Sequence, residues 1–330
     1  MRPSKLILPV PKGAALFCLL LLSSVVKTFA QPIPQEPEVA GEMELIHVQG
    51  KVWLIAGLGG NIAVQIGEQG IVVVDTGAEG FGQQVVDAIA SLSDRPIRYI
   101  INTSIGAQHV GGNAVLGPLP GGRPRGAERG AQVNVLAQET VLFGMSVARG
   151  PGGEQIYPQE AWPTDGYYEG QRGFIFNGEG IDVIHMPNAH TEGDSIVYFR
   201  GSNVLVSGDI YTTSSLPMVD YSRGGSFQGL IAALDRMLDI TIPDDLMEGG
   251  TYIIPGHGYI SDEADLVEYR DMTYIIRDRL QRLIVEEGRD LDGVKEAHPV
   301  LGWEGRYGRE EWSVDMFLEA VYEEFAAQQN

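Results

Sequence analysis

The chain has 330 residues, 44% of them apolar, which is enough for one large packed domain or two small ones. Its 44 acidic residues outnumber its 23 basic residues and give a net charge of −21. An acidic surface repels polyanions, so the composition argues against nucleic acid and anionic lipid as partners.

The first 30 residues have the composition of a secretory signal peptide. Three basic residues precede an apolar run at 14–26, and a Thr-Phe-Ala sequence follows at 28–30. We predict cleavage before Gln31, a secreted or periplasmic location, and no membrane contact afterwards. The alternative is an uncleaved membrane anchor, for which the apolar run is short. The only cysteine, Cys18, lies in this run, so the mature chain has no thiol for a disulfide or a metal.

The rest of the chain divides into three parts. Residues 31–42 combine prolines and acidic residues with few bulky apolar ones, which predicts a flexible leader. Strand and helix patterns then begin, and we assign residues 43–290 to one domain. Residues 291–330 are predicted to form a C-terminal helical extension packed on that domain. The sequence does not indicate the oligomeric state.

The first half of the domain predicts several strands and two helices. Short runs rich in Val and Ile predict strands, and apolar residues at helical spacing predict a helix over 81–92. The predicted strands are 52–56, 61–66, 70–75, 97–101 and 133–136, and the second helix is 138–147. Two loops rich in glycine and proline, 116–132 and 149–173, interrupt the pattern. The aromatic residues of the second loop either border a binding cleft or pack the loop down.

The second half repeats the order of strands followed by helices. Its predicted strands are 174–176, 181–186, 195–199, 204–207 and 251–255. Its predicted helices are 227–238, a long helix from a cap at Ser261 to Gly288, and 310–327. Two halves of this kind suggest two sheets packed face to face with helices outside.

Four polar residues stand out as candidates for chemistry. His109, His190, Asp209 and His257 lie at predicted strand ends or in glycine-rich turns. Such positions are where a rigid scaffold delivers side chains into a shared cleft. The other histidines have no comparable sequence around them.

Five ordered motifs resemble those of the metallo-β-lactamase superfamily. They are Val-Val-Val-Asp75-Thr-Gly, Asn-Thr followed by His109-Val-Gly-Gly-Asn, Ala-His190-Thr-Glu-Gly-Asp194-Ser, Ser-Gly-Asp209 and Pro-Gly-His257-Gly. The match covers about residues 45–260, and both order and spacing agree. The resemblance implies an α+β fold, the four-layer αβ/βα sandwich of two mixed sheets with helices outside. It also implies one or two zinc ions where the loops meet.

The sequence departs from the family in its second motif. The family pattern is His-x-His-x-Asp-His, and this chain has Ser104, Gly106 and Gln108 at the first three of those positions. In the family, the first two histidines and the residue matching His190 build the first metal site. Neutral serine is a poor zinc ligand and glycine has no side chain, so this site would keep one ligand.

The second metal site keeps more of its ligands. The resemblance assigns His109, Asp209 and His257 to it, and His190 either lines the pocket or adds a ligand. Two histidines and a carboxylate with an open fourth position form a recognised catalytic zinc arrangement. Such an ion would lower the pKa of its bound water to about 7. Asp209 and His257 would therefore act in catalysis through that water.

Three further positions matter for how this site would work. Gln108 stands where the family has an aspartate, and a glutamine cannot act as a base at neutral pH. Asp75 and Asp194 match family positions that support loops. We expect these two carboxylates to hold the ligands in place without binding metal.

Two functions are consistent with these residues. The first is a secreted hydrolase that binds one zinc ion and acts on a small amide, lactone, ester or thioester. The second is a non-catalytic pseudoenzyme that binds no zinc and serves as a binding or regulatory protein. The lost positions of the second motif favour the pseudoenzyme, whereas the retained His190, Asp209 and His257 favour the hydrolase. Acidic charge and the export signal argue against a nuclease of this superfamily.

Overall fold

The computed structural model describes residues 42–121, 132–168 and 170–329. The predicted signal peptide lies outside these residues, as do nearly all of the predicted leader and much of the first glycine-rich loop. Among the described residues, no helix is both long enough and apolar enough to cross a membrane.

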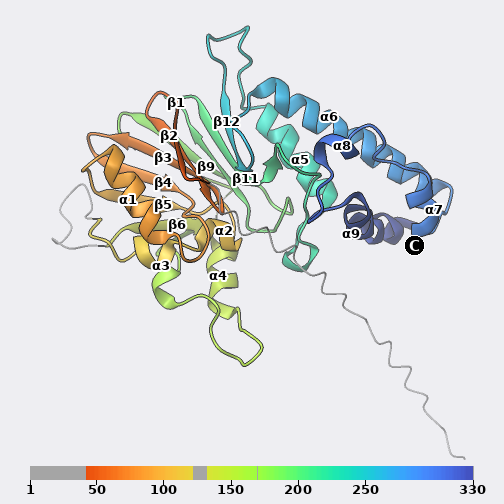
Figure 1. Ribbon diagram of the computed structural model, residues 1–330, viewed down its shortest axis with the longest axis horizontal. Helices are drawn as coiled ribbons and strands as arrows, with labels where there is room; N and C mark the ends of the chain where they lie inside the picture. The colour runs from red at the N-terminus through yellow and green to blue at the C-terminus, as the bar shows by residue number, and fades with distance from the viewer. Residues whose placement is uncertain (1–41, 122–131, 169, 330) are drawn as a thin grey trace, which may run out of the picture. The chain divides into compact units, whose positions relative to one another are not determined.

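A mixed sheet of seven strands forms the N-terminal half (Figure 1). Its strands follow each other in chain order: β1 (Glu44–Gln49), β2 (Val52–Leu58), β3 (Gly60–Gly67), β4 (Gly70–Val74), β5 (Ile97–Ile101), β6 (Asn134–Gln138) and β7 (Asp165–Tyr167). β1 to β4 pair antiparallel, and β4 to β7 pair parallel. The sequence pattern does not predict β1, because this edge strand has only partly buried or exposed side chains and its apolar signal is weak.

A second mixed sheet of five strands follows in the chain. Its strands are β8 (Gln171–Phe176), β9 (Glu179–His185), β10 (Ser195–Phe199), β11 (Val204–Thr212) and β12 (Tyr252–His257), in the spatial order β12-β11-β10-β9-β8. β8 to β11 pair antiparallel, whereas β12 pairs parallel to β11. This parallel pair places β11 and β12 side by side, and each strand carries a candidate residue, Asp209 in β11 and His257 at the end of β12.

The two sheets face each other across one apolar layer. β4 illustrates the pattern, because Val72 and Val74 point into this layer while Ile71 and Val73 point toward the outer helices. β4 is apolar throughout since both of its faces are covered. The second sheet contributes Phe176, Ile181, Val183, Val197, Phe199, Val204, Val206 and Ile254 to the same layer.

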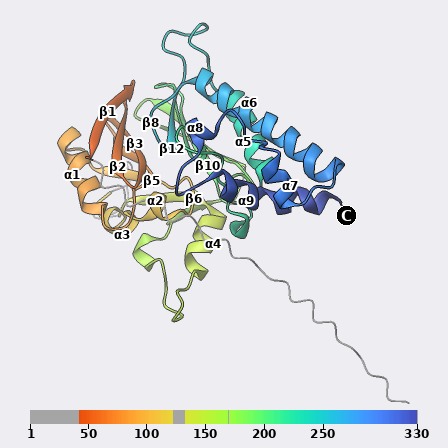
Figure 2. The ribbon, with the colours of Figure 1, turned by 45° about the vertical axis from the view of Figure 1, so that its right-hand side comes forward.

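Helices cover the outer face of each sheet (Figures 1 and 2). α1 (Gly82–Leu92) packs Val85 and Ile89 on the first sheet. α5 (Phe227–Leu238) and α6 (Glu263–Leu280) pack on the second sheet. The remaining helical elements before α6 are short: α2 (Ala107–Val110), α3 (Asn113–Leu116), α4 (Glu139–Val147), η1 (Gln159–Ala161) and η2 (Tyr221–Arg223). The order helix, sheet, sheet, helix confirms the predicted four-layer sandwich.

The C-terminal residues pack against α5 and α6. They form η3 (Gln281–Glu286), α7 (Leu291–Glu296), α8 (Glu304–Tyr307), α9 (Val314–Ala326) and η4 (Ala327–Gln329). Phe317 of α9 lies against Phe227 of α5, with 5.7 Å between the ring centroids. The Glu324 carboxylate accepts hydrogen bonds from the backbone N–H groups of Phe227 (2.7 Å) and Gln228 (3.2 Å). The first N–H groups of a helix have no acceptor within that helix, so Glu324 of α9 caps α5.

Two predicted helix starts differ from the structure. Ser261 does not cap α6, because it exchanges two backbone hydrogen bonds with Ile253 of β12 at 2.8 and 3.0 Å. Asp262 caps α6 instead, its side chain accepting from Asp265 N at 3.0 Å. The last helix begins after a cap at Ser313 and not at 310. In both cases the polar residue with the correct geometry lies one to three positions beyond the predicted start.

Replacing Glu324 with alanine should lower the free energy of unfolding by about 1–3 kcal/mol, because two backbone donors of α5 lose their acceptor. Urea unfolding followed by circular dichroism measures the difference. The matched control is Glu323→Ala, which removes the neighbouring exposed carboxylate. Equal effects of the two substitutions would show that the cap contributes nothing.

Candidate metal centre

A buried carboxylate, Asp75, organises the first sheet's side of the site. It directly follows β4 and has a left-handed backbone, with φ of 63°, which aspartate tolerates better than most residues. Its carboxylate accepts hydrogen bonds from Thr103 N (2.8 Å) and Thr103 Oγ1 (2.7 Å), and it lies 2.7 Å from His109 Nδ1. Asp75 therefore joins the ends of β4 and β5 to α2.

His109 lies on α2 and is fully buried. Its backbone carbonyl accepts from Thr76 N (2.9 Å) and Asn102 Nδ2 (3.1 Å), which fixes the helix against the strand ends. An ionised Asp75 can only accept, so Nδ1 of the imidazole donates to it. Nε2 of the same ring faces Asp209 at 2.8 Å from Oδ2, and its lone pair becomes available to a metal once the ring gives up its second proton. A carboxylate on the other ring nitrogen is the usual support of a metal-binding histidine.

Asp209 and His257 come from the parallel pair β11 and β12. The pairing register of these strands shifts on both sides of Gly208, whose φ is 54°, and the irregularity sets the direction of the Asp209 side chain. A Cβ atom at Gly256 would lie 2.5 Å from Asp209 Oδ1, so the approach of the carboxylate requires glycine there. Asp209 therefore lies inside a strand that runs to Thr212, not at the predicted strand end. His257 is the last residue of β12.

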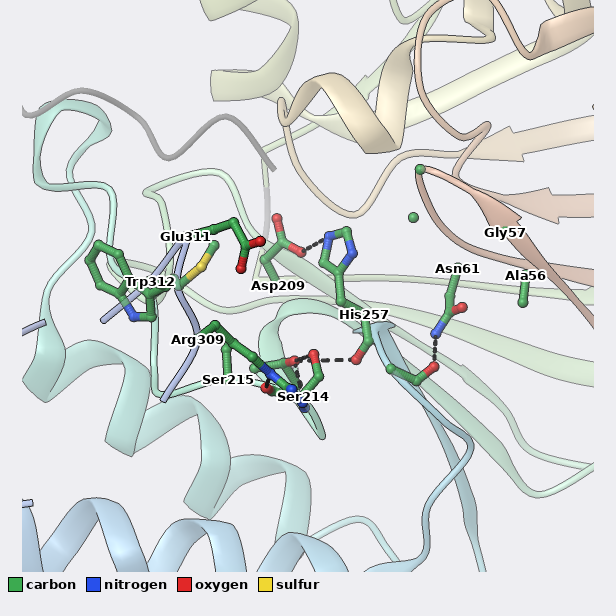
Figure 3. A pocket seen from close by; sticks show the side chains of 15 residues that line it. Ala56, Gly57, Asn61, Asp209, Ser214, Ser215, His257, Arg309, Glu311 and Trp312 are labelled. Atoms are coloured by element: carbon green, nitrogen blue, oxygen red, sulfur yellow. Dashed lines mark hydrogen bonds and ion pairs between the residues drawn. The ribbon is translucent and has the colours of Figure 1, made fainter. Parts of the chain in front are cut away.

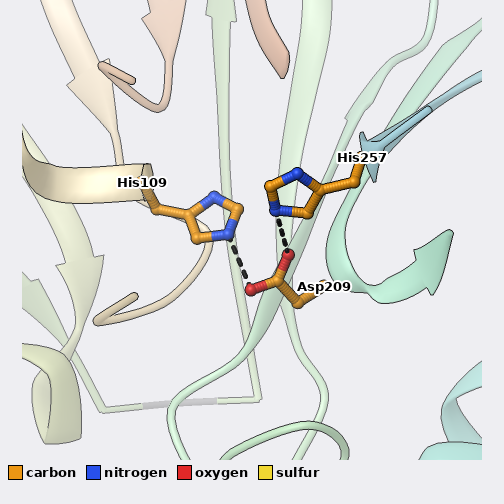
Figure 4. A group of neighbouring side chains, drawn as sticks. All are labelled: His109, Asp209 and His257. Atoms are coloured by element: carbon orange, nitrogen blue, oxygen red, sulfur yellow. Dashed lines mark ion pairs between the residues drawn. The ribbon is translucent and has the colours of Figure 1, made fainter. Parts of the chain in front are cut away.

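The three side chains converge on one point (Figure 4). His109 Nε2 lies 2.8 Å from Asp209 Oδ2, and His257 Nε2 lies 3.4 Å from Asp209 Oδ1. One potential ligand atom from each residue lies within 4.8 Å of the other two. Roughly 2.0–2.2 Å zinc bonds at tetrahedral angles place ligand atoms about 3.3–3.6 Å apart. The three ligand atoms, which lie up to 4.8 Å apart, would therefore have to draw together slightly around an ion.

The hydrogen bonding of these atoms also fits a cation. His109 Nε2 and Asp209 Oδ1 are buried, and neither makes a hydrogen bond of good geometry with the described residues. Buried polar atoms normally have partners, so such atoms facing one point indicate a ligand. Two imidazole nitrogens and one carboxylate are a donor set suited to zinc. His109, Asp209 and His257 would hold the ion.

Charge pairing dominates the protonation of this site. Burial alone lowers the pKa of His109, but Asp209 and Asp75 outweigh burial and raise that pKa well above its ordinary value of 6.5. Burial alone raises the pKa of Asp209, but His109 and His257 outweigh it and hold that pKa well below 3.8. In the metal-free protein, His109 is therefore a cation between two carboxylates. A metal ion would have to displace its proton.

His190 and Asp194 lie beside this cluster. His190 Nε2 is 3.8 Å from Asp209 Oδ2, and its Nδ1 lies 3.0 Å from the Met218 carbonyl oxygen. His190 thus borders the site but is not one of the three converging residues. The Asp194 carboxylate accepts from Thr191 N (2.7 Å) and Thr191 Oγ1 (2.6 Å), and burial raises its pKa to about 6. Asp194 shapes the turn that carries His190.

Ser104, Gly106 and Gln108, which differ from the family's second motif, form no second metal-binding cluster. Ser104 Oγ accepts from the backbone N–H of Gly106 at 3.1 Å, and the Gln108 side chain is half-buried near Gly60. A Cβ atom at Gly106 would lie 2.8 Å from Cδ2 of His109, so even a small side chain there would press on that ring. Within the described ranges, no other three His, Cys, Asp or Glu residues lie close enough to share a metal.

A cavity of about 340 Å³ opens from this cluster (Figure 3). Asp209 and His257 line it, and so do Asn61, Met218, Arg309, Glu311 and Trp312. The sequence does not predict that Arg309, Glu311 and Trp312 line this cavity, because no local pattern connects them with residues 209 and 257. The predicted role of the 149–173 aromatics in a cleft is not met at this cavity, since none of them lines it.

Asp75→Asn should weaken zinc binding by about 10- to 100-fold, because the His109 ring loses the charged acceptor that orients it. Asparagine tolerates the left-handed backbone, so the fold should survive. Competition with a chromophoric chelator measures the affinity. Asp87→Asn removes a carboxylate from the exposed face of α1 and should leave the affinity unchanged; an unchanged affinity for both variants would refute the role of Asp75.

Zinc affinity should rise about tenfold per pH unit as the pH approaches the raised pKa of His109 from below, because one proton must leave, and the rise should stop above that pKa. Calorimetry in buffers of different ionisation enthalpy counts that proton. The sign is opposite for the metal-free fold: a raised folded-state pKa stabilises it fully below about pH 6.5, and this stabilisation is lost as the pH rises through the raised value. If zinc binding releases no proton, the assignment of His109 as a zinc ligand is wrong.

Comparison with known proteins agrees with the architecture. A sequence profile of the metallo-beta-lactamase superfamily matches residues 55–257. The metallo-beta-lactamase from Pontibacter korlensis is 14% identical, with a TM-score of 0.54 over 71% of this chain and 99% of that one. The sec-alkylsulfatase Pisa1 from Pseudomonas sp. is 17% identical, with a TM-score of 0.60 over 86% of this chain and 50% of that one.

A third solved structure, the DIM-1 metallo-beta-lactamase, is 14% identical, with a TM-score of 0.53 over 71% of this chain and 98% of that one. The search of curated protein sequences gives no significant match. The structural similarities show the fold, and the profile covers more than half of the chain with all five motifs in order. The chain belongs to the metallo-β-lactamase superfamily.

Proposed function

We propose that this protein is a hydrolase that binds one zinc ion through His109, Asp209 and His257. The supporting observation is the convergence of these three side chains, one potential ligand atom from each lying within 4.8 Å of the others, at the end of a cavity. When bound, the ion supplies Lewis-acid activation of water and of a carbonyl group. We propose a small amide, lactone, ester or thioester as the substrate, because the cavity of about 340 Å³ suits a small molecule.

The chain's own residues then have distinct tasks. Asp75 fixes the His109 ring, and Gly256 lets the Asp209 carboxylate approach β12. His190, whose Nε2 lies 3.8 Å from the same carboxylate, would exchange a proton with the site through one bridging water molecule. Gln108 supplies no base at the family's aspartate position, so the reaction should be slower than with a carboxylate there.

A non-catalytic binding protein is the second candidate. The observation that favours it is Gly106, where a side chain would press on His109, so the first metal site is absent from the fold and not merely from the motif. A pseudoenzyme of this kind would keep the cavity and bind its small molecule without cleaving it. The two candidates differ in metal content and in turnover.

Purified protein expressed with added zinc should contain about one equivalent of the metal, and His257→Ala or Asp209→Asn should lose most of it. Plasma mass spectrometry measures the content. His298→Asn is the matched control, because His298 is exposed and has a left-handed backbone that asparagine accepts. A metal-free wild type would exclude the zinc hydrolase.

Turnover should be tested with a panel of a lactone, an aryl ester, a thioester and a β-lactam. The similarity to Pisa1, described as a sec-alkylsulfatase, adds a secondary alkyl sulfate to that panel. Hydrolysis that is lost in His257→Ala supports the hydrolase. One zinc ion without turnover of any substrate in the panel would support the metal site and contradict hydrolysis of these substrate classes.

We also propose that the protein is exported, on the basis of the composition of residues 1–30. The mature protein recovered from its native host should begin at Gln31. N-terminal sequencing decides this, and an intact Met1 in a cytoplasmic fraction would contradict export.

A further inference from the structure

A C-terminal segment, residues 309–312, forms one wall of the cavity. It connects α8 to α9 and lies outside the stretch that the superfamily profile matches. Hydrogen bonds tie this segment and Tyr307 to the 214–217 turn after β11. Leu216 N donates to the Tyr307 carbonyl at 3.0 Å, and Trp312 Nε1 donates to the Pro217 carbonyl at 3.3 Å. The wall is therefore held in place by the body of the domain.

Arg309 of this segment is attached to the same turn. Its Nε donates to the Ser214 carbonyl. Ser214 N in turn donates to Thr212 Oγ1 (3.2 Å), and Thr212 Oγ1 donates to the carbonyl of His257 (3.2 Å). A short chain of hydrogen bonds thus connects the arginine to the strand end that carries a zinc ligand. Figure 3 shows Arg309 and Trp312 among the lining residues, with Asp209 and His257 between them and Asn61.

Charge distinguishes Arg309 from the rest of the lining. It is the one lysine or arginine among the residues that line the cavity, in a chain whose net charge is −21. No described carboxylate is close enough to form an ion pair with it, although Glu311 lines the same cavity. With Nε bonded to Ser214, the guanidinium keeps the edge formed by its two terminal nitrogens. That edge matches a carboxylate in two parallel hydrogen bonds.

Arg309 is exposed, and the cavity that it lines has apolar as well as polar side chains. Trp312 is buried, Met218 is half-buried, and both line the cavity together with Ala56 and several glycines. A ligand that fills this space would contact apolar side chains along its body. A cation at one side of a cavity that also offers apolar side chains fixes the orientation of such a ligand.

We propose that Arg309 selects substrates that carry a carboxylate beside a small apolar body. The carboxylate would bind the guanidinium, the body would contact Trp312 and Met218, and the bond to be cleaved would lie at Asp209 and His257. The cleavage rests on the proposed hydrolase function, whereas recognition of the carboxylate by Arg309 does not.

Binding of phenylacetate, compared with 2-phenylethanol as its uncharged analogue, tests the proposal. Calorimetry on the zinc-loaded full chain should show saturable binding of phenylacetate that Arg309→Gln weakens about tenfold or more. The same substitution should leave the binding of 2-phenylethanol unchanged. Arg309→Lys should restore part of the affinity, because lysine keeps the charge but not the paired geometry.

Arg306→Gln is the matched control. Arg306 lies three residues away, pairs with Glu268 and does not line the cavity. Its substitution therefore removes the same charge without changing the lining of the cavity. An equal loss in both variants would show only general attraction and would overturn the proposal. So would the absence of saturable phenylacetate binding.

Two groups at the cavity could bind the carboxylate of phenylacetate, the guanidinium of Arg309 and the zinc ion. The substitution His257→Ala distinguishes between them. Loss of phenylacetate binding in His257→Ala but not in Arg309→Gln would place the carboxylate on the metal and overturn the role of Arg309. Arg309→Gln should keep about one zinc ion. If instead the wild type binds no zinc yet loses phenylacetate in Arg309→Gln, the proposed hydrolase fails and the recognition by Arg309 stands.

Discussion

The site depends on one buried carboxylate that is completely satisfied. Asp75 has almost no exposure to solvent, and its two oxygens receive the Thr103 backbone, the Thr103 hydroxyl and the His109 ring. A buried charge without such partners would destabilise the fold by several kcal/mol, so these groups are constrained to meet. The same contacts orient Nε2 of His109 toward the second sheet. The interactions of Asp75 thus stabilise the ends of β4 and β5 and also set the geometry of the metal centre.

The other half of the site depends on close backbone approach in the second sheet. Gly208 and Gly256 let Asp209 lie between the two histidines, since a Cβ atom at Gly256 would collide with the Asp209 carboxylate. The apolar layer between the sheets then brings His109 from one sheet to Asp209 and His257 from the other. The centre therefore exists only when both sheets are packed. Metal binding should be coupled to that packing, because the ligands come from both sides.

The loss of the family's first three motif residues has a steric side as well as a chemical one. Ser104 and Gly106 lack imidazoles, and the space above Gly106 is taken by the ring of His109. The chain has kept a compact three-residue cluster and a cavity beside it, and its C-terminal segment closes one wall of that cavity. A single-ion hydrolase and a binding protein both fit this outcome. Arg309 gives either of them a means of choosing an anionic ligand.

The sequence by itself determined the architecture, because alternation, helical spacing and glycine turns are local, and five motifs in order identify the superfamily. It also pointed to His109, Asp209 and His257 together. It missed β1, whose apolar signal is weak at an exposed edge, and it placed the α6 cap at Ser261, which pairs with Ile253 instead. Only the tertiary structure decided that Arg309 and Trp312 line the cavity, that Glu324 caps α5 and that Gly106 faces His109. These contacts join residues far apart in the chain or depend on ring orientation, and neither leaves a local pattern.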